Sequence, residues 1–319
     1  MSDQYTIRAA KSHEEARDTW WPLMQELGWN RSSDDALTHY TSTGPEGWLM
    51  LAPHDSEKPE GCIVPFVFDN NTGWVGFFAL TAPYRGRGWG GALFQKCLDH
   101  LKENGATTVG LDAVAEQKKT YERRGFVETG MIRLEMRPSL KEMPLKEKLS
   151  SMRLKDGELL LEITKNTPKE VFARSDLAHT GMLRKKLWTD EALFSRKDTF
   201  GFYIASKPND LMGLEIEGWI VVRRCEHGFR IGPLYATSFD HASILLRAAM
   251  QKTDGQEGSF IAETWMGNPN GPKVFEDLGF KWAEVDYHRM WIDAKAPKEQ
   301  SKGGKAETDV YAMFDAGQG

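Results

Sequence analysis

The sequence predicts an α/β protein built from two tandem copies of one domain type. Three observations lead to this prediction. Short apolar runs typical of strands alternate with segments of helical periodicity along the chain. A pattern in the first half returns in the second half at a constant distance. The length of 319 residues suits two domains of ordinary size.

The first half is expected to begin with a strand over 5–9 and a helix over 14–27, in which apolar residues recur at helical spacing. A second helix is expected over 92–103, because Asn104-Gly105 supplies residues that tolerate the left-handed conformation of a helix end. The remaining elements expected here are strands over 61–68, 73–80, 107–114 and 131–136, and a short helix over 121–126 that Gly125 stops.

A charged, weakly periodic segment, 139–152, is interpreted as a linker. It divides the chain into an N-terminal domain, 1–138, and a C-terminal domain, 153–319. Strands and helices resume after it. They are strands over 159–163, 202–205, 219–223 and 229–235, helices over 168–188 and 240–252, a strand that ends near Met290, and a final strand over 309–314.

The repeat is visible in a short motif that closes each half. Glu122-Arg-Arg-Gly-Phe126 returns as Glu276-Asp-Leu-Gly-Phe280, 154 positions later. The same spacing carries the first strand onto the expected strand at 159–163, and Leu80 onto Leu234. Three features at one spacing indicate a duplicated α/β domain.

Composition and charge exclude several classes of protein. Hydrophobic residues make up 40% and charged residues 27%, as in a globular protein with a sizeable core. No run of about 18 apolar residues occurs and the N-terminus is polar, so neither a membrane span nor a secretory signal is expected. The net charge of −5 disfavours nucleic acid as a partner. Three widely spaced cysteines favour neither disulfides nor a metal site, and a reducing cytoplasm fits them best.

The most informative segment is Arg85-Gly-Arg-Gly-Trp-Gly-Gly91, between an expected strand and an expected helix. Glycines let the backbone approach a ligand and turn its N–H groups inward. The start of the helix adds the positive end of a dipole. Arg85 and Arg87 could add charged hydrogen bonds, so the segment predicts a site for a phosphate or pyrophosphate.

One alternative for this loop is a dinucleotide. Gly86-x-Gly88-x-x-Gly91 matches the dinucleotide fingerprint, and Asp112 stands where a ribose ligand would be expected. That fingerprint normally follows the first strand of its domain directly. Here about 70 residues precede the loop and Thr-Ala-Pro-Tyr84 intervenes, so an NAD-type oxidoreductase is the less favoured hypothesis.

A second match is closer. Arg85-x-x-Gly88-x-Gly90 resembles the Q/R-x-x-G-x-G/A signature of the GNAT acyl-CoA N-acyltransferase superfamily. Tyr121-Glu-Arg-Arg-Gly-Phe126 resembles its downstream Tyr-Glu-x-x-Gly-Phe segment. Gly28-Trp-Asn30 and Arg230-Ile-Gly-Pro-Leu-Tyr235 resemble a tandem subgroup with a divergent C-terminal GNAT-like domain. The resemblance implies two GNAT-like domains, each a mixed sheet flanked by helices.

The resemblance also implies roles for particular residues. In the family the CoA pyrophosphate lies on the amides of the loop, and the pantetheine arm lies along the preceding strand. Tyr121 falls where the family often has a tyrosine that protonates the departing thiolate, although it could instead be a packing residue. Trp29 and Asn30 stand where the acceptor is covered, although Asn30 could instead cap the helix. The implied cofactor-binding residues are Phe78, Ala79, Leu80, Arg85, Gly86, Arg87, Gly88, Trp89, Gly90 and Gly91.

The chain departs from the family pattern near Tyr121. Many members have an asparagine about seven residues before the tyrosine, where this chain has Val114. Gln117-Lys-Lys119 replaces apolar helix positions, which makes a shorter helix.

The second half is expected to lack a cofactor site. The spacing of 154 residues aligns Arg85–Leu93 with Phe239–Arg247, which replaces the glycines Gly86, Gly88 and Gly90 by Asp240, Ala242 and Ile244. An acidic residue and bulky side chains oppose phosphate binding. A single acyl-CoA site is therefore expected, in the N-terminal domain. The C-terminal domain is expected to shape the acceptor pocket or to stabilise its partner.

The implied reaction is acetyl-CoA-dependent N-acetylation of a primary amine of a small molecule, by direct attack on the thioester. The alternative is a non-catalytic acyl-CoA sensor, because no general base can be identified. Asp112 and Glu26 could act through water, but each is also explained as a solvated or capping carboxylate. A small amine is the expected partner of a monomer or homodimer. His39, His179 and His241 are expected at the surface.

Overall fold

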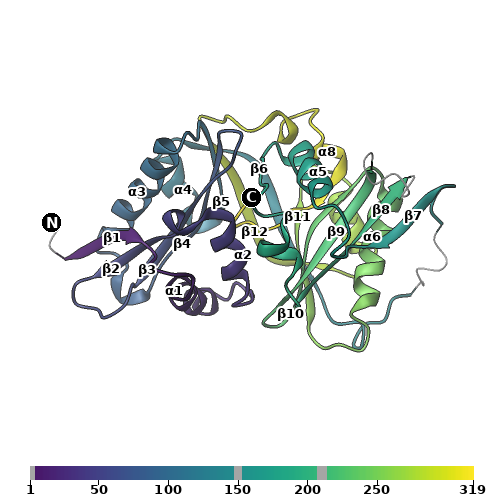
Figure 1. Cartoon of the computed structure of the whole chain (residues 1–319), viewed down its shortest axis with the longest axis horizontal. Helices are drawn as coiled ribbons and strands as arrows, with labels where there is room; N and C mark the ends of the chain where they lie inside the picture. Colours follow the sequence, from purple (N-terminus) through teal and green to yellow (C-terminus); the bar gives the residue numbers. More distant parts are fainter. Residues whose placement is uncertain (1–3, 147–152, 207–213) are drawn as a thin grey trace.

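The computed structural model describes residues 4–146, 153–206 and 214–319. The N-terminal half is drawn in purple to blue and the C-terminal half in green to yellow in Figure 1. The elements of the N-terminal half are β1 (Tyr5–Ala9), α1 (His13–Glu26), α2 (Asp35–Thr43), β2 (Leu49–Pro53), β3 (Gly61–Val67), β4 (Thr72–Leu80), α3 (Trp89–Glu103), β5 (Thr108–Val114), α4 (Lys118–Glu122) and β6 (Phe126–Arg137). Those of the C-terminal half are β7 (Glu158–Glu162), α5 (Glu170–Thr180), β8 (Thr199–Ser206), β9 (Glu215–Cys225), β10 (Gly228–Ala236), α6 (Phe239–Lys252), β11 (Ser259–Trp265), α7 (Gly271–Glu276), β12 (Lys281–Ile292), α8 (Ala306–Asp309) and β13 (Val310–Ala312).

The strands of both halves form one mixed sheet of 13 strands across the described residues. Its order is β1-β2-β3-β4-β5-β12-β6-β11-β13-β10-β9-β8-β7. The last long strand of each half therefore lies beside a strand of the other half. β12 lies beside β5, and β6 lies beside β11, the strand of the C-terminal half that corresponds to β5. β12 pairs with β5 through Tyr287 and Val114, and β6 pairs with β11 through Ile132 and Trp265. The two expected sheets are thus joined by exchange of one strand each, which Figure 1 shows as β12 and β6 side by side at the centre.

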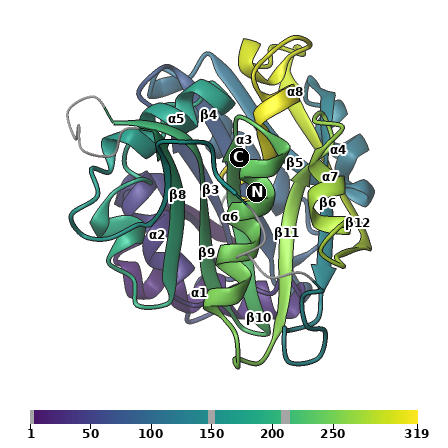
Figure 2. The same cartoon turned by 90° about the vertical axis from the view of Figure 1, so that its right-hand side faces the viewer.

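Helices cover both faces of this sheet. In the N-terminal half, Trp20 and Leu23 of α1 pack on one face, against Met50 and Cys62. On the other face α3 packs against the side chains that alternate with these, because neighbouring residues of a strand point to opposite sides. Figure 2 looks onto α6, which covers one face of the sheet in the C-terminal half. No helix of the described residues is long and apolar enough to cross a membrane.

The parallel strands β4 and β5 diverge soon after they meet. Their pairing covers Thr72–Trp74 and Thr108–Gly110 only. Beyond Trp74, β4 continues to Leu80 without β5 beside it in the ladder, which leaves an opening between the two strands. This opening faces the glycine loop that follows β4.

The equivalent strands of the C-terminal half diverge in the same way, but their opening is filled. β10 and β11 pair in parallel over 228–231 and 259–262. Beyond that point β13 lies between them, so that Ala312 pairs with both Leu234 and Thr264. A strand of the chain itself closes the opening of this half.

Most expected elements are confirmed within a few residues, but the helix expected over 168–188 is wrong. α5 ends at Thr180, because Gly181 has a φ of 73° and ends it in the left-handed conformation. A Cβ atom at Gly181 would also lie 2.4 Å from the side chain of Pro297, so only glycine fits there. The expectation of a final strand near 309–314 is confirmed by β13. α2, β2 and β11 were not expected from the sequence.

The segment interpreted as a linker is described in part. Leu140 is buried and packs in the core of the C-terminal half. Ser139 accepts a hydrogen bond from the backbone N–H of Glu142 at 3.3 Å. Residues 147–152 of the segment lie outside the described residues. The domain limits 1–138 and 153–319 stay a prediction, because the two halves exchange strands across them.

Candidate active site

A cavity of about 540 Å³ fills the opening between β4 and β5. It runs from the glycine loop to the boundary with the C-terminal half. Its walls come from β4, β5, the loop after α1, the segment around α4, and two segments of the C-terminal half. The lining residues are Leu27, Trp29, Arg31, Val75, Phe77, Phe78, Ala79, Leu80, Tyr84, Arg85, Gly86, Gly90, Leu111, Asp112, Val114, Glu116, Gln117, Tyr121, Tyr287, Ala316 and Gly317.

β4 carries a bulge where it borders this cavity. Its pairing with β3 runs from Gly76 opposite Val64 to Ala79 opposite Cys62, so β4 holds one extra residue there. Phe77 has a φ of 51°, an unfavourable conformation for a residue with a bulky side chain. Such strain is often found at functional sites. The bulge takes backbone groups out of the ladder and leaves them beside the cavity.

The glycine loop has the backbone that its sequence predicts. Gly86 and Gly88 have φ values of 75° and 83°, and a Cβ atom at either would meet no atom within 4 Å. Gly88 is the N-cap of α3, and the first N–H groups of a helix have no acceptor within it. Gly91 is the exception, because its N–H donates to the carbonyl oxygen of Gly88 at 3.1 Å. The loop presents an open surface of N–H groups in front of the cavity.

The two arginines of the loop have different surroundings. Arg85 donates from Nε to the carbonyl oxygen of Leu80 at 2.7 Å and from Nη2 to Glu26 at 2.8 Å. It therefore ties the loop to the end of β4 and to α1. The guanidinium of Arg87 lies over the rings of Tyr84 and Trp89, 4.7 and 5.0 Å from their centroids, and 3.9 Å from the carboxylate of Asp55. Six of the ten residues expected at the cofactor line the cavity, and Arg87, Gly88, Trp89 and Gly91 do not.

Tyr121 lies on α4 and lines the cavity. Its ring packs against Phe94 and Phe126, with centroid distances of 5.5 and 6.3 Å. Its hydroxyl makes no hydrogen bond to the described residues. Burial raises the pKa of Tyr121 to about 12. The hydroxyl is therefore protonated at neutral pH, as an acid for a thiolate must be.

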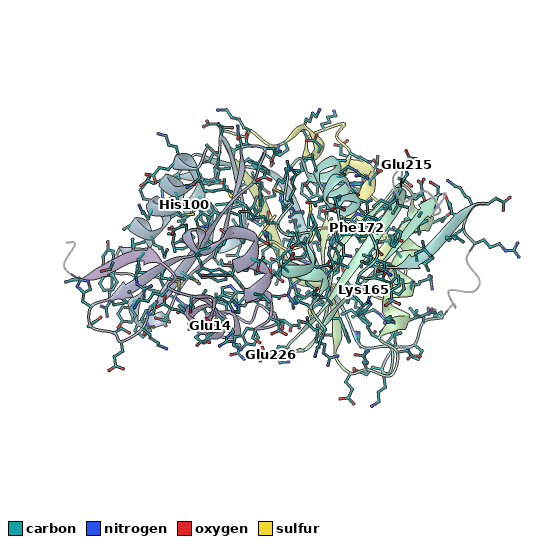
Figure 3. All side chains as sticks on the ribbon, in the orientation of Figure 1. Glu14, His100, Lys165, Phe172, Glu215 and Glu226 are labelled. Carbon is teal, nitrogen blue, oxygen red and sulfur yellow. The ribbon has the colours of Figure 1, made fainter. Side chains whose placement is uncertain are left out.

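Trp29 and Asn30 follow α1 and have separate environments. Trp29 lines the cavity. The Oδ1 atom of Asn30 accepts a hydrogen bond from the backbone N–H of His227 at 2.9 Å, so this side chain joins the two halves and is not among the lining residues. The same junction holds a hydrogen bond of 2.8 Å from Gln25 to Glu226, which is labelled there in Figure 3.

The C-terminal half supplies part of the cavity wall. Tyr287 on β12 lines it, as do Ala316 and Gly317 after β13. The indole N–H of Trp74 donates to the carbonyl oxygen of Ala316 at 3.1 Å. A Cβ atom at Gly76 would lie 2.0 Å from the carbonyl oxygen of Gly317, so β4 and this segment are in direct backbone contact.

Buried charges surround this part of the cavity and are paired. Arg31 forms an ion pair with Asp315, which also accepts from Arg223 at 3.3 Å. Burial alone would raise the pKa of Asp35, but Arg223 and Arg196 hold that pKa well below its usual value. The network joins the loop after α1 to β9 and to the segment after β13.

The expectation that His39, His179 and His241 lie at the surface is wrong. Their exposures are 0%, 6% and 3%. Each meets a polar group that offsets its burial: His39 bonds to Gln318 at 2.9 Å and His241 to Glu158 at 3.0 Å. Burial lowers the pKa of His39 to about 4, so its ring is neutral at pH 7.

Both carboxylates considered as a general base are paired. Asp112 accepts from Nη2 and Nε of Arg289 at 2.7 and 2.9 Å, and both side chains are fully buried. Burial raises the pKa of Asp112 above its usual value even with Arg289 beside it. Glu26 is bound by Arg85 at the surface.

The residue alignment of the second half at a spacing of 154 is wrong in detail. β10 ends at Ala236 and α6 begins at Phe239, capped by the side chain of Ser238. Two residues therefore connect strand and helix, where eight residues, 81–88, do so in the N-terminal half. The glycine loop is missing from this half rather than replaced in place. With β13 between β10 and β11, the described residues contain no second opening of this kind.

Comparisons with known proteins agree with this architecture. A model of the acetyltransferase (GNAT) family matches residues 13–126, and a model of an acetyltransferase (GNAT) domain matches residues 203–302. The chain is 25% identical over 306 residues to the holothin acyltransferase of Pseudoalteromonas sp. (strain SANK 73390), which covers 93% of this chain and 91% of the relative.

Solved structures share the fold over the whole length. An acetyltransferase candidate from Pyrococcus horikoshii has a TM-score of 0.73 at 19% identity, covering 100% of this chain and 97% of that one. A tandem GNAT protein from the clavulanic acid biosynthesis pathway has a TM-score of 0.63 at 13% identity, covering 91% and 99%. With two GNAT matches that together span more than half of it, the chain belongs to the GNAT acyltransferase superfamily as a tandem protein with two GNAT domains.

Proposed function

We propose that this chain is an acetyl-CoA-dependent N-acyltransferase that acylates a primary amine of a small molecule at a single site in its N-terminal half. One observation carries the proposal. The opening between β4 and β5 leads from a glycine loop at a helix start to a half-buried, protonated tyrosine, Tyr121. A phosphate site can hold the CoA pyrophosphate, a slot beside an unpaired strand can hold its pantetheine arm, and an acid can protonate the departing thiolate.

Along the cavity, successive groups of residues suit successive parts of an acyl-CoA molecule. The N–H groups around Gly86 and Gly90 hold the pyrophosphate, where the start of α3 favours negative charge. Phe78, Ala79 and Leu80 offer the free edge of β4 to the amide groups of the pantetheine arm. The thioester then lies beside the bulge, where a backbone N–H, such as that of Leu80, polarises its carbonyl oxygen.

The chemistry is a direct attack. The amine nitrogen forms a bond to the carbonyl carbon, the carbon–sulfur bond breaks, and Tyr121 donates its proton to the departing thiolate. The surplus proton on the nitrogen leaves to solvent and Tyr121 regains a proton from solvent, so that the amide, the CoA thiol and Tyr121 are all neutral and no charge stays in the apolar pocket.

The C-terminal half has no acyl-CoA site in this proposal. β13 fills the opening that the cofactor would need, and the connection before α6 has no glycine loop. Its contribution is the wall formed by Tyr287, Ala316 and Gly317. The relative named holothin acyltransferase, 25% identical to this chain, supports acyl transfer as the reaction of this chain.

Calorimetric titration with acetyl-CoA tests the single site, and release of CoA thiol with a panel of primary amines tests the transfer. We expect one acetyl-CoA per chain and amine-dependent thiol release. Binding without release for every amine supports an acyl-CoA sensor instead. Binding of NAD but not of acetyl-CoA contradicts both the transferase and the sensor. It would show that the glycine loop binds a dinucleotide.

A further inference from the structure

The cavity has two ends of different character. The cofactor end is formed by Phe78–Leu80, Arg85, Gly86, Gly90 and Tyr121. The acceptor end is formed by Trp29, Arg31, Phe77, Asp112, Tyr287 and the segment Ala316–Gly317. The inference below concerns the acceptor end and rests on the function proposed above.

Flat aromatic side chains form much of the wall at the acceptor end. Trp29 comes from the loop after α1 and Tyr287 from β12 of the other half, and both are partly exposed. Phe77, from the bulge of β4, is buried, and its ring packs in the core against Trp20 and His39. The Tyr287 ring also packs against the core clusters of the C-terminal half, which fixes its position. Its hydroxyl makes no hydrogen bond to the described residues. These groups suit a ring-shaped molecule with an atom that can bond to a hydroxyl.

The charged groups at the acceptor end are already paired. Arg31 is held by Asp315, and its guanidinium lies 5.0 Å from the centroid of Phe77. Asp112 is held by two hydrogen bonds from Arg289. Among the described residues of the acceptor end, no unpaired carboxylate is left to hold an ammonium group and no unpaired guanidinium is left to hold a carboxylate. One further carboxylate among the lining residues, that of Glu116, is exposed and forms no ion pair or hydrogen bond with the described residues, so the experiment below tests it as a base.

The pairing of Asp112 also removes the base that an alkylamine needs. An alkylamine has a pKa near 10, so only about one molecule in a thousand is neutral at pH 7. A site for such an acceptor normally supplies a group that takes its proton. An amine whose lone pair is delocalised into a ring is neutral at pH 7 and needs no such group.

We infer that the acceptor is a neutral, weakly basic amine attached to an aromatic or unsaturated ring, which packs between Trp29 and Tyr287. Its nitrogen attacks the thioester in the neutral form. After the carbon–nitrogen bond forms, the surplus proton on nitrogen leaves to solvent through the open mouth of the cavity. The carbon–sulfur bond breaks, Tyr121 gives its proton to sulfur, and Tyr121 regains a proton from solvent. No oxidant or further reactant is required.

Two isomeric amines test this inference directly with acetyl-CoA as the donor. 4-Methylaniline carries its nitrogen on the ring, and benzylamine has the same atoms with the nitrogen on a saturated carbon. We expect kcat/KM to be about 100-fold higher for 4-methylaniline at pH 7, since general-base assistance contributes about that much where it exists. We also expect kcat/KM for 4-methylaniline to be constant from pH 6.5 to 9, and that for benzylamine to rise about tenfold per pH unit.

Two variants test the aromatic wall of the acceptor end and the carboxylate of Glu116 separately. Replacing Tyr287 by leucine (Tyr287→Leu) keeps apolar volume but removes the flat ring, and should raise KM for 4-methylaniline about tenfold without changing KM for acetyl-CoA. Glu116→Gln should leave kcat/KM within about twofold, because a base is not needed. A 100-fold loss in Glu116→Gln would identify Glu116 as the base and overturn the inference.

The other outcomes are equally decisive. Preference for benzylamine, spermidine or lysine at pH 7 overturns the inference but leaves acyl transfer to amines in place. Absence of thiol release with every amine, while acetyl-CoA still binds, overturns the proposed function and this inference with it. Thermal unfolding of each variant shows whether a loss of activity reflects a loss of fold.

Discussion

Arg289 on β12 holds Asp112 on β5 through two hydrogen bonds of 2.7 and 2.9 Å, across the strand pair that joins the two halves of the molecule. Both side chains are fully buried. The guanidinium also lies 4.7 Å from the ring centroid of Trp74, at the point where β4 and β5 separate. One residue of the C-terminal half thus fixes both a lining carboxylate and the start of the opening in the other half.

Replacing Arg289 by methionine should destabilise the protein by about 3 kcal/mol, because it leaves a buried carboxylate without its partner. The pKa of Asp112 is already above its usual value, and loss of the guanidinium raises it further. A carboxyl group with a raised pKa destabilises the fold when it is ionised, so the deficit should be smaller at pH 5 than at pH 8. Urea unfolding at the two pH values measures this. The double variant Arg289→Met with Asp112→Leu should recover part of the loss; no recovery means that the pair is not the cause.

Replacing Tyr121 by phenylalanine should lower kcat by about 100-fold, the usual contribution of a general acid. KM for acetyl-CoA should stay the same, since the ring still packs against Phe94. With a pKa of about 12, Tyr121 keeps its proton up to pH 9, so the wild-type rate should show no alkaline decline from this group. Tyr40→Phe, on α2 outside the cavity, is the control. Equal rates for both variants would show that Tyr121 only packs.

Two glycines with the same backbone conformation separate a ligand effect from a folding effect. Gly86 in the loop and Gly105 after α3 have φ values of 75° and 86°, and neither has an atom within 4 Å of a Cβ position. Alanine at either should cost about 1 kcal/mol of stability from the left-handed conformation. Only Gly86→Ala should also raise the Kd for acetyl-CoA, by about tenfold, because it disturbs a charged hydrogen bond to phosphate. Calorimetry on both variants checks this, and equal Kd values contradict a phosphate site at the loop.

Stability should fall in weak acid because of His39. Its folded pKa is about 4 against an unfolded value of 6.5, so the unfolded chain binds a proton that the folded chain excludes. The contribution is full above pH 6.5 and is lost as the pH falls to 4, about 3 kcal/mol in all. His39→Gln should flatten this part of the pH profile, whereas His227→Gln, which changes an exposed histidine, should not. A profile unchanged in His39→Gln would place the acid sensitivity elsewhere.

Local patterns in the sequence predicted the parts of the site that are local in the chain. β4, the glycine loop and α3 follow one another directly, and periodicity and glycine placement identify each of them. α2 was missed because its sequence, DALTHYTST, carries no apolar stripe. It is buried through Asp35, Thr38 and His39, whose ion pairs and hydrogen bonds come from distant residues such as Arg196.

The strand exchange could not be predicted in the same way. In the sequence, β6 and β12 look like ordinary closing strands of their own halves. The alternation of their side chains does not specify whether β5 or β11 will lie beside each of them. The acceptor end depends on this exchange, because β12 brings Tyr287 beside Val114. The ion pair of Asp112 could not be predicted for the same reason, because its partner Arg289 also lies on β12.

The exchange of β6 and β12 also governs how the protein is made. During synthesis, β5 lacks its native partner on one edge until β12, a strand of the other half, has been made. Folding of the cofactor-binding half is therefore completed only after most of the polypeptide has left the ribosome. A duplication joined in this way cannot be divided again into two separate genes without leaving each product with an unsatisfied strand edge.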